Sequence, residues 1–283
     1  PAHVEFYSGP DEVAREKGKI IEALQITGFA ILNYDDEAAL NLKEKTRAHL
    51  MTFGFNEGAD IRITAFENRS EELPTGFYKP LGIAFKLEYN NSFVPIRLDG
   101  AFGKAQAYAV AAAACVGVVF GLPLMRIAEA IQYYQAPPRR LKLVPGIKGT
   151  YILDDSYNAS PMSMHAAIDT VKDLKAKRKV AILGDMLELG QFTIQAHEHI
   201  GHLAAKAFHL LVTVGPRARL IAAAAEEAGF DKTRILSFDT ADNAKGEIQT
   251  LIQKGDLILI KGSRAIALDK IVEEIRHLSA PIV

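Results

Sequence analysis

Short apolar runs alternate with helical patterns throughout the second half of the chain. The apolar runs predict strands at residues 150–153, 180–183, 210–214, 235–238 and 257–260. Apolar residues that recur every three or four positions predict helices at 161–174, 196–207, 218–228, 241–253 and 267–277. Strict alternation of strand and helix indicates βαβ units, and therefore an α/β fold with a mainly parallel sheet covered on both faces.

The first half of the chain has a mixed pattern. It predicts helices at residues 10–24, 37–49, 104–120 and 124–133, and strands at 29–32, 60–65, 83–89 and 93–98. A length of 283 residues corresponds to about two domains at about 150 residues each. Pro137 and Pro138 stiffen the chain after the last of these helices, so we predict one domain at 1–137 and a Rossmann-like domain at 138–283.

Composition and charge exclude several classes of protein. A net charge of −1 gives no basic field for a nucleic acid, so we expect no nucleic-acid partner. Residues 105–125 carry no charge, but this stretch is rich in alanine and is broken by Gly121 and Pro123. We therefore expect a buried helix and no membrane insertion. The single cysteine, Cys115, and the absence of a secretion signal favour a cytoplasmic location.

The first strand of the second half ends in a cluster of polar residues, 154–161. Because the carboxyl ends of parallel strands form the ligand crevice, we expect Asp155 to have a functional role there. Helix capping is the alternative explanation for Ser160 and Pro161, since serine before proline is a common helix start. Capping does not explain the two adjacent acids.

Two further strands deliver polar groups to the same edge. The strand at 180–183 is followed by Asp185 and Glu188, whose carboxylates could accept hydrogen bonds from an amine or another cation. The last strand is followed by residues 261–264, Lys-Gly-Ser-Arg. Cations and acids that converge at one edge favour an anionic substrate over a solvated surface.

For four further residues, the sequence pattern does not decide between a functional role and a solvated surface position. Arg139 and Arg140 fit a solvated linker as well as an anion clamp, and His3 and Lys17 are unremarkable in their local sequence. The 283 residues contain no Gly-x-x-x-x-Gly-Lys-[Ser/Thr] loop, no zinc-type Cys/His cluster and no Gly-x-Ser-x-Gly motif.

Three motifs in this order, Asp-Asp-Ser-Tyr-Asn-Ala-Ser-Pro at 154–161, Gly-Asp-Met-Leu-Glu-Leu-Gly at 184–190 and Lys-Gly-Ser-Arg at 261–264, resemble the Mur ligase family. The resemblance covers nearly the whole chain. It implies the later part of a central ATPase domain followed by the family's Rossmann-like carboxyl-terminal domain. The branch with the most similar motifs adds D-alanyl-D-alanine to UDP-N-acetylmuramoyl-tripeptide, in peptidoglycan synthesis.

The resemblance also implies a reaction. ATP phosphorylates a substrate carboxylate, and the amine then attacks the acyl phosphate to form an amide. Metal ions and cationic side chains must neutralise the negative charge that this chemistry brings together. The implied cofactors are therefore ATP and Mg²⁺.

Roles for individual residues are implied as well. By resemblance, His3 and a carbamylated Lys17 bind Mg²⁺, since a carbamate supplies the oxygen ligands that this ion prefers. Lys17, Arg140 and Asp155 are the implied catalytic residues. The implied nucleotide-binding residues are Arg140, Asp155, Asn158 and Gln106. The implied substrate-binding residues are Asp185, Glu188, Lys261, Ser263 and Arg264.

The chain also departs from the family. The UDP-binding domain and the phosphate loop are not in these 283 residues, so we expect them elsewhere in a longer protein or on another chain, and no ligation by this chain alone. The family's adenine-contacting His and Asn residues are replaced, and Gln106 is the only amide left. One alternative is a non-catalytic partner subunit that kept the fold. Another is a ligase for a different acceptor, of the folyl or cyanophycin type.

Overall fold

The computed structural model describes residues 10–277, and their contacts divide them into two compact units. The amino unit comprises residues 10–69 and Gly82–Gln135, and the carboxyl unit comprises Ser70–Leu81 and residues 136–277. A single cut after Pro137 does not describe this division, because Ser70–Leu81 cluster with the later residues. The predicted α/β fold class is confirmed, and the sheet of the carboxyl unit is mainly parallel.

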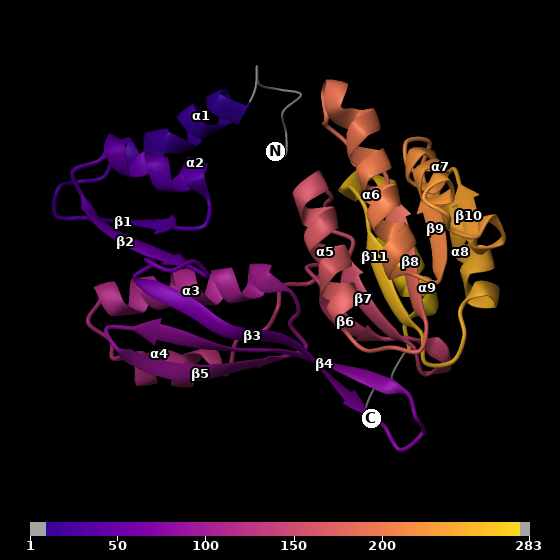
Figure 1. The fold of residues 1–283 in the computed structure, drawn as a ribbon, viewed down its shortest axis with the longest axis horizontal. Coiled ribbons are helices and arrows are strands. Elements are labelled where there is room, and N and C mark those ends of the chain that lie inside the picture. The colour runs from indigo at the N-terminus through magenta and orange to yellow at the C-terminus, as the bar shows by residue number, and fades with distance from the viewer. Residues whose placement is uncertain (1–9, 278–283) are drawn as a thin grey trace. The chain divides into compact units, whose positions relative to one another are not determined.

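The carboxyl unit is built on a six-stranded sheet with the order β10-β9-β8-β11-β7-β6 (Figure 1). Its strands are β6 (Lys142–Pro145), β7 (Tyr151–Asp155), β8 (Lys179–Gly184), β9 (Leu210–Val214), β10 (Ile235–Phe238) and β11 (Leu257–Lys261). All neighbouring pairs are parallel except β6 with β7. The sequence predicted the five parallel strands and missed β6, which has four residues, one of them a proline.

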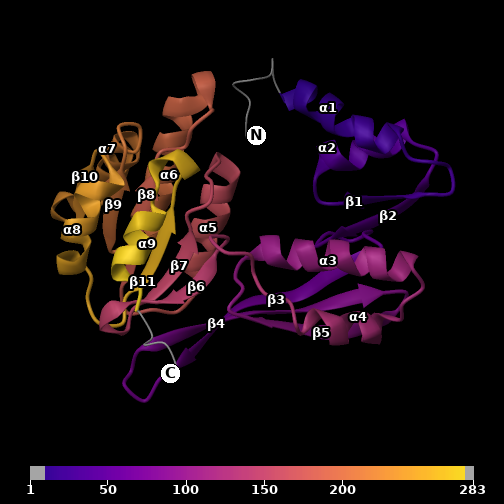
Figure 2. The same cartoon turned by 180° about the vertical axis from the view of Figure 1, so that it is seen from behind.

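Helices cover both faces of this sheet. α5 (Pro161–Asp173), α6 (Thr193–Ala207) and α7 (Arg219–Glu227) pack side by side, and Figure 1 shows α5 and α6 in front of the strands. α8 (Ala241–Leu251) and α9 (Asp269–Ile275) pack together, in front of the sheet in the reversed view of Figure 2. One buried cluster joins Ala244 and Ile248 of α8 and Ile271 of α9 to the central strands. Burial on both faces explains why these strands read as continuous apolar runs.

The amino unit contains a five-stranded sheet in the order β1-β2-β3-β4-β5. The strands are β1 (Phe29–Asn33), β2 (His49–Gly54), β3 (Ile61–Glu72), β4 (Tyr78–Tyr89) and β5 (Ser92–Asp99). The far ends of β3 and β4, within residues 70–81, belong to the carboxyl unit. β4 and β5, which contain the predicted strands 83–89 and 93–98, pair antiparallel across the turn at Asn90 and Asn91.

The helices of the amino unit are α1 (Pro10–Glu22), α2 (Glu37–Leu40), α3 (Lys104–Val119) and α4 (Leu124–Ile131). The predicted helix at 37–49 was wrong: α2 is followed by a 3₁₀ turn at Asn41–Lys45, and His49 begins β2. Thr46 after the 3₁₀ turn has an extended backbone (φ −136°, ψ 155°), which leads the chain into β2, where His49 to Phe53 pair with β1. α3 packs on β1 and β2. Within residues 10–277, no helix is long and apolar enough to cross a bilayer.

Candidate active site

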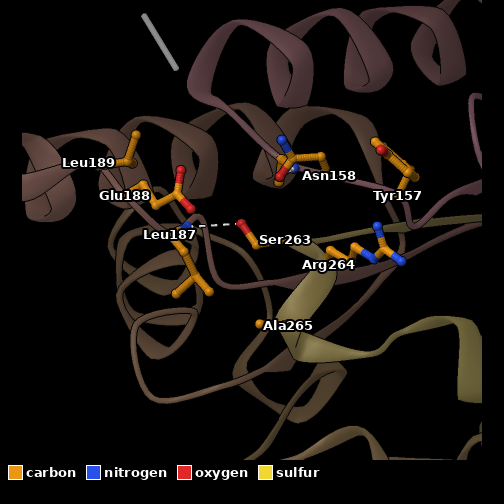
Figure 3. Close-up of a pocket in the computed structure, with 9 residues that line it drawn as sticks. Tyr157, Asn158, Leu187, Glu188, Leu189, Ser263, Arg264 and Ala265 are labelled. Atoms are coloured by element: carbon orange, nitrogen blue, oxygen red, sulfur yellow. Dashed lines mark hydrogen bonds between the residues drawn. The ribbon is translucent and has the colours of Figure 1, made fainter. Parts of the chain in front are cut away.

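A pocket of about 570 Å³ opens at the carboxyl ends of three neighbouring strands, β7, β11 and β8 (Figure 3). Each strand is followed by three lining residues: Tyr157, Asn158 and Ala159 after β7, Leu187, Glu188 and Leu189 after β8, and Ser263, Arg264 and Ala265 after β11. The parallel register brings the three strand ends level, since Lys261 pairs with both Asp155 and Leu183. This is the edge at which the sequence predicted a site.

A buried ion pair lies beside the pocket and contributes to none of its walls. Lys261 Nζ lies 2.6 Å from Asp155 Oδ2 and donates a hydrogen bond of 2.8 Å to the carbonyl oxygen of Asn158. The other Asp155 oxygen accepts from the Leu141 backbone N–H at 3.1 Å. Burial raises the pKa of Asp155 and lowers the pKa of Lys261, while the opposite charge of each opposes its partner's shift. The pair therefore fixes the chain after β7, on which Tyr157 and Asn158 lie.

Asp185 also lies behind the pocket. Its side chain is 1% exposed, and Oδ1 accepts from the Ala218 backbone N–H at the start of α7, at 2.6 Å. Its backbone carbonyl accepts from the Ser263 N–H at 2.9 Å. A carboxylate at a helix start satisfies unpaired N–H groups there. Asp185 thus connects the loop after β8 to the start of α7 and to the end of β11, and it is not among the residues that line this pocket.

The charged side chains that do line the pocket are Glu188 and Arg264, and in Figure 3 Ser263 lies between them. Arg264 is exposed and Glu188 is half-buried. The Ser263 hydroxyl accepts a hydrogen bond of 2.9 Å from the Leu187 N–H, which ties the loop after β8 to the end of β11. The pocket therefore offers a cation, an anion and apolar atoms of Leu187, within a preorganised frame.

Tyr157 is a pocket residue that the sequence analysis did not select. The Arg140 guanidinium carbon lies 4.2 Å from the centre of the Tyr157 ring, and that of Arg264 lies 5.7 Å from it. Guanidinium groups at such distances are attracted to the aromatic face. The signal was present in the sequence as a tyrosine inside the first motif, but its two arginine partners lie 17 and 107 positions away, and only the fold brings them together.

Two predicted site residues lie in the amino unit. Lys17 is exposed on α1. Gln106 is buried near the start of α3 and accepts a hydrogen bond from the Tyr134 hydroxyl. Phe102, which lies just before α3, is completely buried in the core of this unit. His3 lies outside the described residues. Within residues 10–277 no group of three or more His, Cys, Asp or Glu side chains is arranged to hold a metal ion.

Comparison with known proteins identifies the class of protein that this fold and pocket define. The family described as Mur ligase middle domain matches residues 1–117, and the Mur ligase, glutamate ligase domain matches residues 139–264. The chain therefore belongs to the Mur ligase family, which confirms the resemblance drawn from the three motifs.

The relatives and the solved structure described next share one ligase name within that family, that of the D-alanyl-D-alanine ligase MurF. The chain is 28% identical over 278 residues to UDP-N-acetylmuramoyl-tripeptide--D-alanyl-D-alanine ligase of Bacillus subtilis, and 28% identical over 283 residues to the Escherichia coli enzyme of the same name. A crystal structure of MurF from Acinetobacter baumannii superimposes with a TM-score of 0.78 at 25% identity, covering 96% of this chain. The alignment with the B. subtilis protein covers 97% of this chain and 57% of that protein, and the alignment with the E. coli protein covers 98% of this chain and 58% of that protein. The superposition covers 57% of the A. baumannii chain. The chain thus spans little more than half the length of these relatives.

Proposed function

We propose that this chain acts in ATP-dependent amide-bond formation, joining D-alanyl-D-alanine to UDP-N-acetylmuramoyl-tripeptide through an acyl phosphate. The observation that carries the proposal is the pocket at the ends of β7, β8 and β11, which combines the Arg264 guanidinium, the Glu188 carboxylate and a small apolar wall. Relatives that carry this ligase's name align with nearly the whole chain.

The pocket suits a small zwitterion such as a dipeptide. A guanidinium binds a carboxylate with two parallel hydrogen bonds, so Arg264 takes the dipeptide's carboxylate. Glu188 faces the amino group, from which a proton must be lost before the nitrogen can attack an acyl phosphate. Leu187, Ala159 and Ala265 line the remaining space, which fits methyl side chains.

Other parts of the reaction are assigned to residues by family resemblance. Arg140 holds the γ-phosphate of ATP, and Asn158 and Gln106 contact the nucleotide. The resemblance also assigns Asp155 to nucleotide contact, but its buried ion pair with Lys261 supports a different role, that of keeping Lys261 and the chain after β7 in place. Since the 283 residues contain no Gly-x-x-x-x-Gly-Lys-[Ser/Thr] motif, we propose that residues outside them, in the same protein or a partner chain, cradle the phosphates.

Mg²⁺ belongs to the same proposal. The Lys17 side chain is exposed, so its amine is accessible to carbon dioxide, and the resulting carbamate offers oxygen ligands of the kind that Mg²⁺ prefers. Together with His3 it would hold an ion that neutralises phosphate charge. A cytoplasmic location is proposed because the nucleotide substrates are made there.

The direct test is a ligation assay that follows the tripeptide, the dipeptide and ATP by mass spectrometry. We expect the protein encoded by the complete reading frame to form one amide for each ATP consumed, and the 283-residue chain alone to form none. Product made by this chain alone would contradict the assignment of the phosphate cradle to other residues. Preference for glutamate over D-alanyl-D-alanine would favour a ligase of the folyl or cyanophycin type.

The same assay, together with the coding sequence, distinguishes the ligase from the alternative of a non-catalytic partner subunit. A phosphate-loop motif encoded upstream of Pro1 supports the enzyme. A start codon directly before Pro1, with no amide formed by the complete protein, supports the partner subunit.

A further inference from the structure

His197 occupies a buried position that the pocket chemistry does not use. It lies on α6, is completely buried, and comes 12 positions after Asp185, the first residue after β8. Both ring nitrogens are within hydrogen-bonding distance of backbone atoms: Nδ1 lies 2.6 Å from the Thr193 carbonyl oxygen, and Nε2 lies 3.0 Å from the Met186 nitrogen.

These two contacts determine the tautomer. A carbonyl oxygen can only accept, so Nδ1 must carry the proton that is donated to Thr193. The Met186 N–H can only donate, so Nε2 must be unprotonated and accept. The neutral Nδ1–H form of His197 satisfies both contacts, whereas the doubly protonated ring would point Nε2–H at the Met186 N–H.

The Met186 N–H belongs to the loop that forms one wall of the pocket. The next residues, Leu187, Glu188 and Leu189, line that wall, and the Leu187 N–H is held by the Ser263 hydroxyl. Glu188 adopts a left-handed conformation with φ of 61°, which few residues other than glycine favour. A backbone in that conformation persists only when its surroundings hold it in place. His197 and Ser263 supply two consecutive anchors immediately before it.

We propose that His197 is a positioning residue for the pocket, which holds the loop after β8 in its binding conformation through the Met186 N–H and releases it when the imidazole is protonated. The proposal rests on the proposed function only for the identity of the ligand. The anchoring contact itself is independent of that identity.

Burial lowers the pKa of His197, so the neutral form that accepts from Met186 is the form present near neutral pH. The charged groups that act on the ring are Asp185, on the loop after β8, which favours protonation, and Arg217, before α7, which opposes it. The neighbouring helix α5 brings His165 to α6, where its ring contacts His199. Since an unfolded histidine has a pKa of about 6.5, stability from this contact is present above that pH and is lost as the pH falls through the lower folded value.

Three variants of the 283-residue chain separate positioning from simple packing. His197→Leu fills the site but removes the acceptor. His197→Gln keeps an acceptor oxygen at a comparable distance along the side chain and cannot titrate in this range. His202→Leu, on the same helix at an exposed position, is the matched control.

The first measurement is amide hydrogen exchange at Met186 and Leu187, followed by NMR. We expect His197→Leu to raise exchange at these amides at least tenfold, His197→Gln to restore protection, and His202→Leu to change nothing. Equal protection in wild type and His197→Leu would overturn the proposal, and this readout needs no ligand.

The second measurement is the pH dependence of D-alanyl-D-alanine binding. In the wild type we expect the Kd to rise at least tenfold as the pH falls through the folded-state pKa of His197, which burial holds below the ordinary value of about 6.5, in parallel with loss of protection at Met186. His197→Gln should remove that dependence. An unchanged pH profile in His197→Gln would overturn the proposal. Failure of the wild type to bind the dipeptide at any pH, with the Met186 results as expected, would contradict the proposed function and leave the anchor supported.

Discussion

Two cations at the end of β11 lie only three positions apart but are in opposite surroundings. Lys261 is 2% exposed and paired with Asp155, whereas Arg264 is exposed at the pocket. A buried ammonium is stable only with a partner, because its desolvation costs several kcal/mol. From the family resemblance, both cations were expected to bind substrate. The structure gives Lys261 a supporting position and leaves Arg264 as the cation available to a ligand.

We expect Lys261→Met to destabilise the chain by about 3–5 kcal/mol, because it leaves the Asp155 carboxylate buried without its charge partner. Denaturant unfolding monitored by circular dichroism measures the change. Lys270→Met is the control, since Lys270 pairs with Asp242 at an exposed site and should cost at most about 1 kcal/mol. Equal losses in the two variants would refute a structural role for the buried pair.

At the scale of the elements, the connection between β9 and α7 requires a close approach of the Asp185 side chain to the backbone at Gly215. Gly215 follows β9 with φ of 111°, and a Cβ atom there would lie 2.3 Å from Asp185 Oδ1. That oxygen accepts the Ala218 N–H at the start of α7. The absence of a side chain at Gly215 therefore lets the carboxylate reach the helix, and links β8 to α7.

We expect Gly215→Ala to destabilise the chain by more than Gly229→Ala. Gly229 also has positive φ, 90°, but a Cβ there would meet nothing within 4 Å, so its substitution carries only the conformational cost of about 1–2 kcal/mol. Gly215→Ala adds the displacement of Asp185. Thermal and denaturant unfolding of both variants give the comparison. Indistinguishable losses would show that Asp185 tolerates displacement.

Element prediction succeeded where burial produces an unambiguous pattern. The five parallel strands of the carboxyl unit were predicted because both faces are covered and each reads as an apolar run. β2 was missed because only its pairing with β1 distinguishes it from the helical pattern before it. A pocket opens at the strand ends where the sequence predicted a site. The sequence did not reveal which acids and cations would be buried, since Asp155, Asp185 and Lys261 have partners that are distant in sequence.

At the scale of the whole molecule, the chain's two units are not two consecutive segments. Residues 70–81, at the ends of β3 and β4, belong to the carboxyl unit. There the Lys177 ammonium lies 4.7 Å from the centre of the Phe77 ring, and the Lys175 N–H donates to the Ser70 hydroxyl at 3.3 Å. Nothing local in these residues indicates this docking, so a single boundary was the natural expectation from sequence.

We expect Phe77→Ala to destabilise the carboxyl unit by about 1–2 kcal/mol, through lost apolar burial and lost cation–π attraction. Hydrogen exchange measured by mass spectrometry should show faster exchange in the segments that carry Lys177 and Lys254, whose ammonium groups lie near the ring. Phe93→Ala, an exposed aromatic of the amino unit that also faces a lysine, is the control and should leave those segments unchanged. Unchanged exchange in Phe77→Ala would contradict the docking.

The central claim is that the pocket at the ends of β7, β8 and β11 binds the incoming dipeptide with its carboxylate on Arg264. Calorimetric titration of the 283-residue chain with D-alanyl-D-alanine tests it most directly. We expect saturable binding by the wild type, a Kd at least tenfold higher in Arg264→Ala because a charge-assisted hydrogen bond is worth about 1.5–3 kcal/mol, and an unchanged Kd in Arg276→Ala, an exposed arginine elsewhere in the same unit. No binding by the wild type, or equal binding by wild type and Arg264→Ala, would contradict the account.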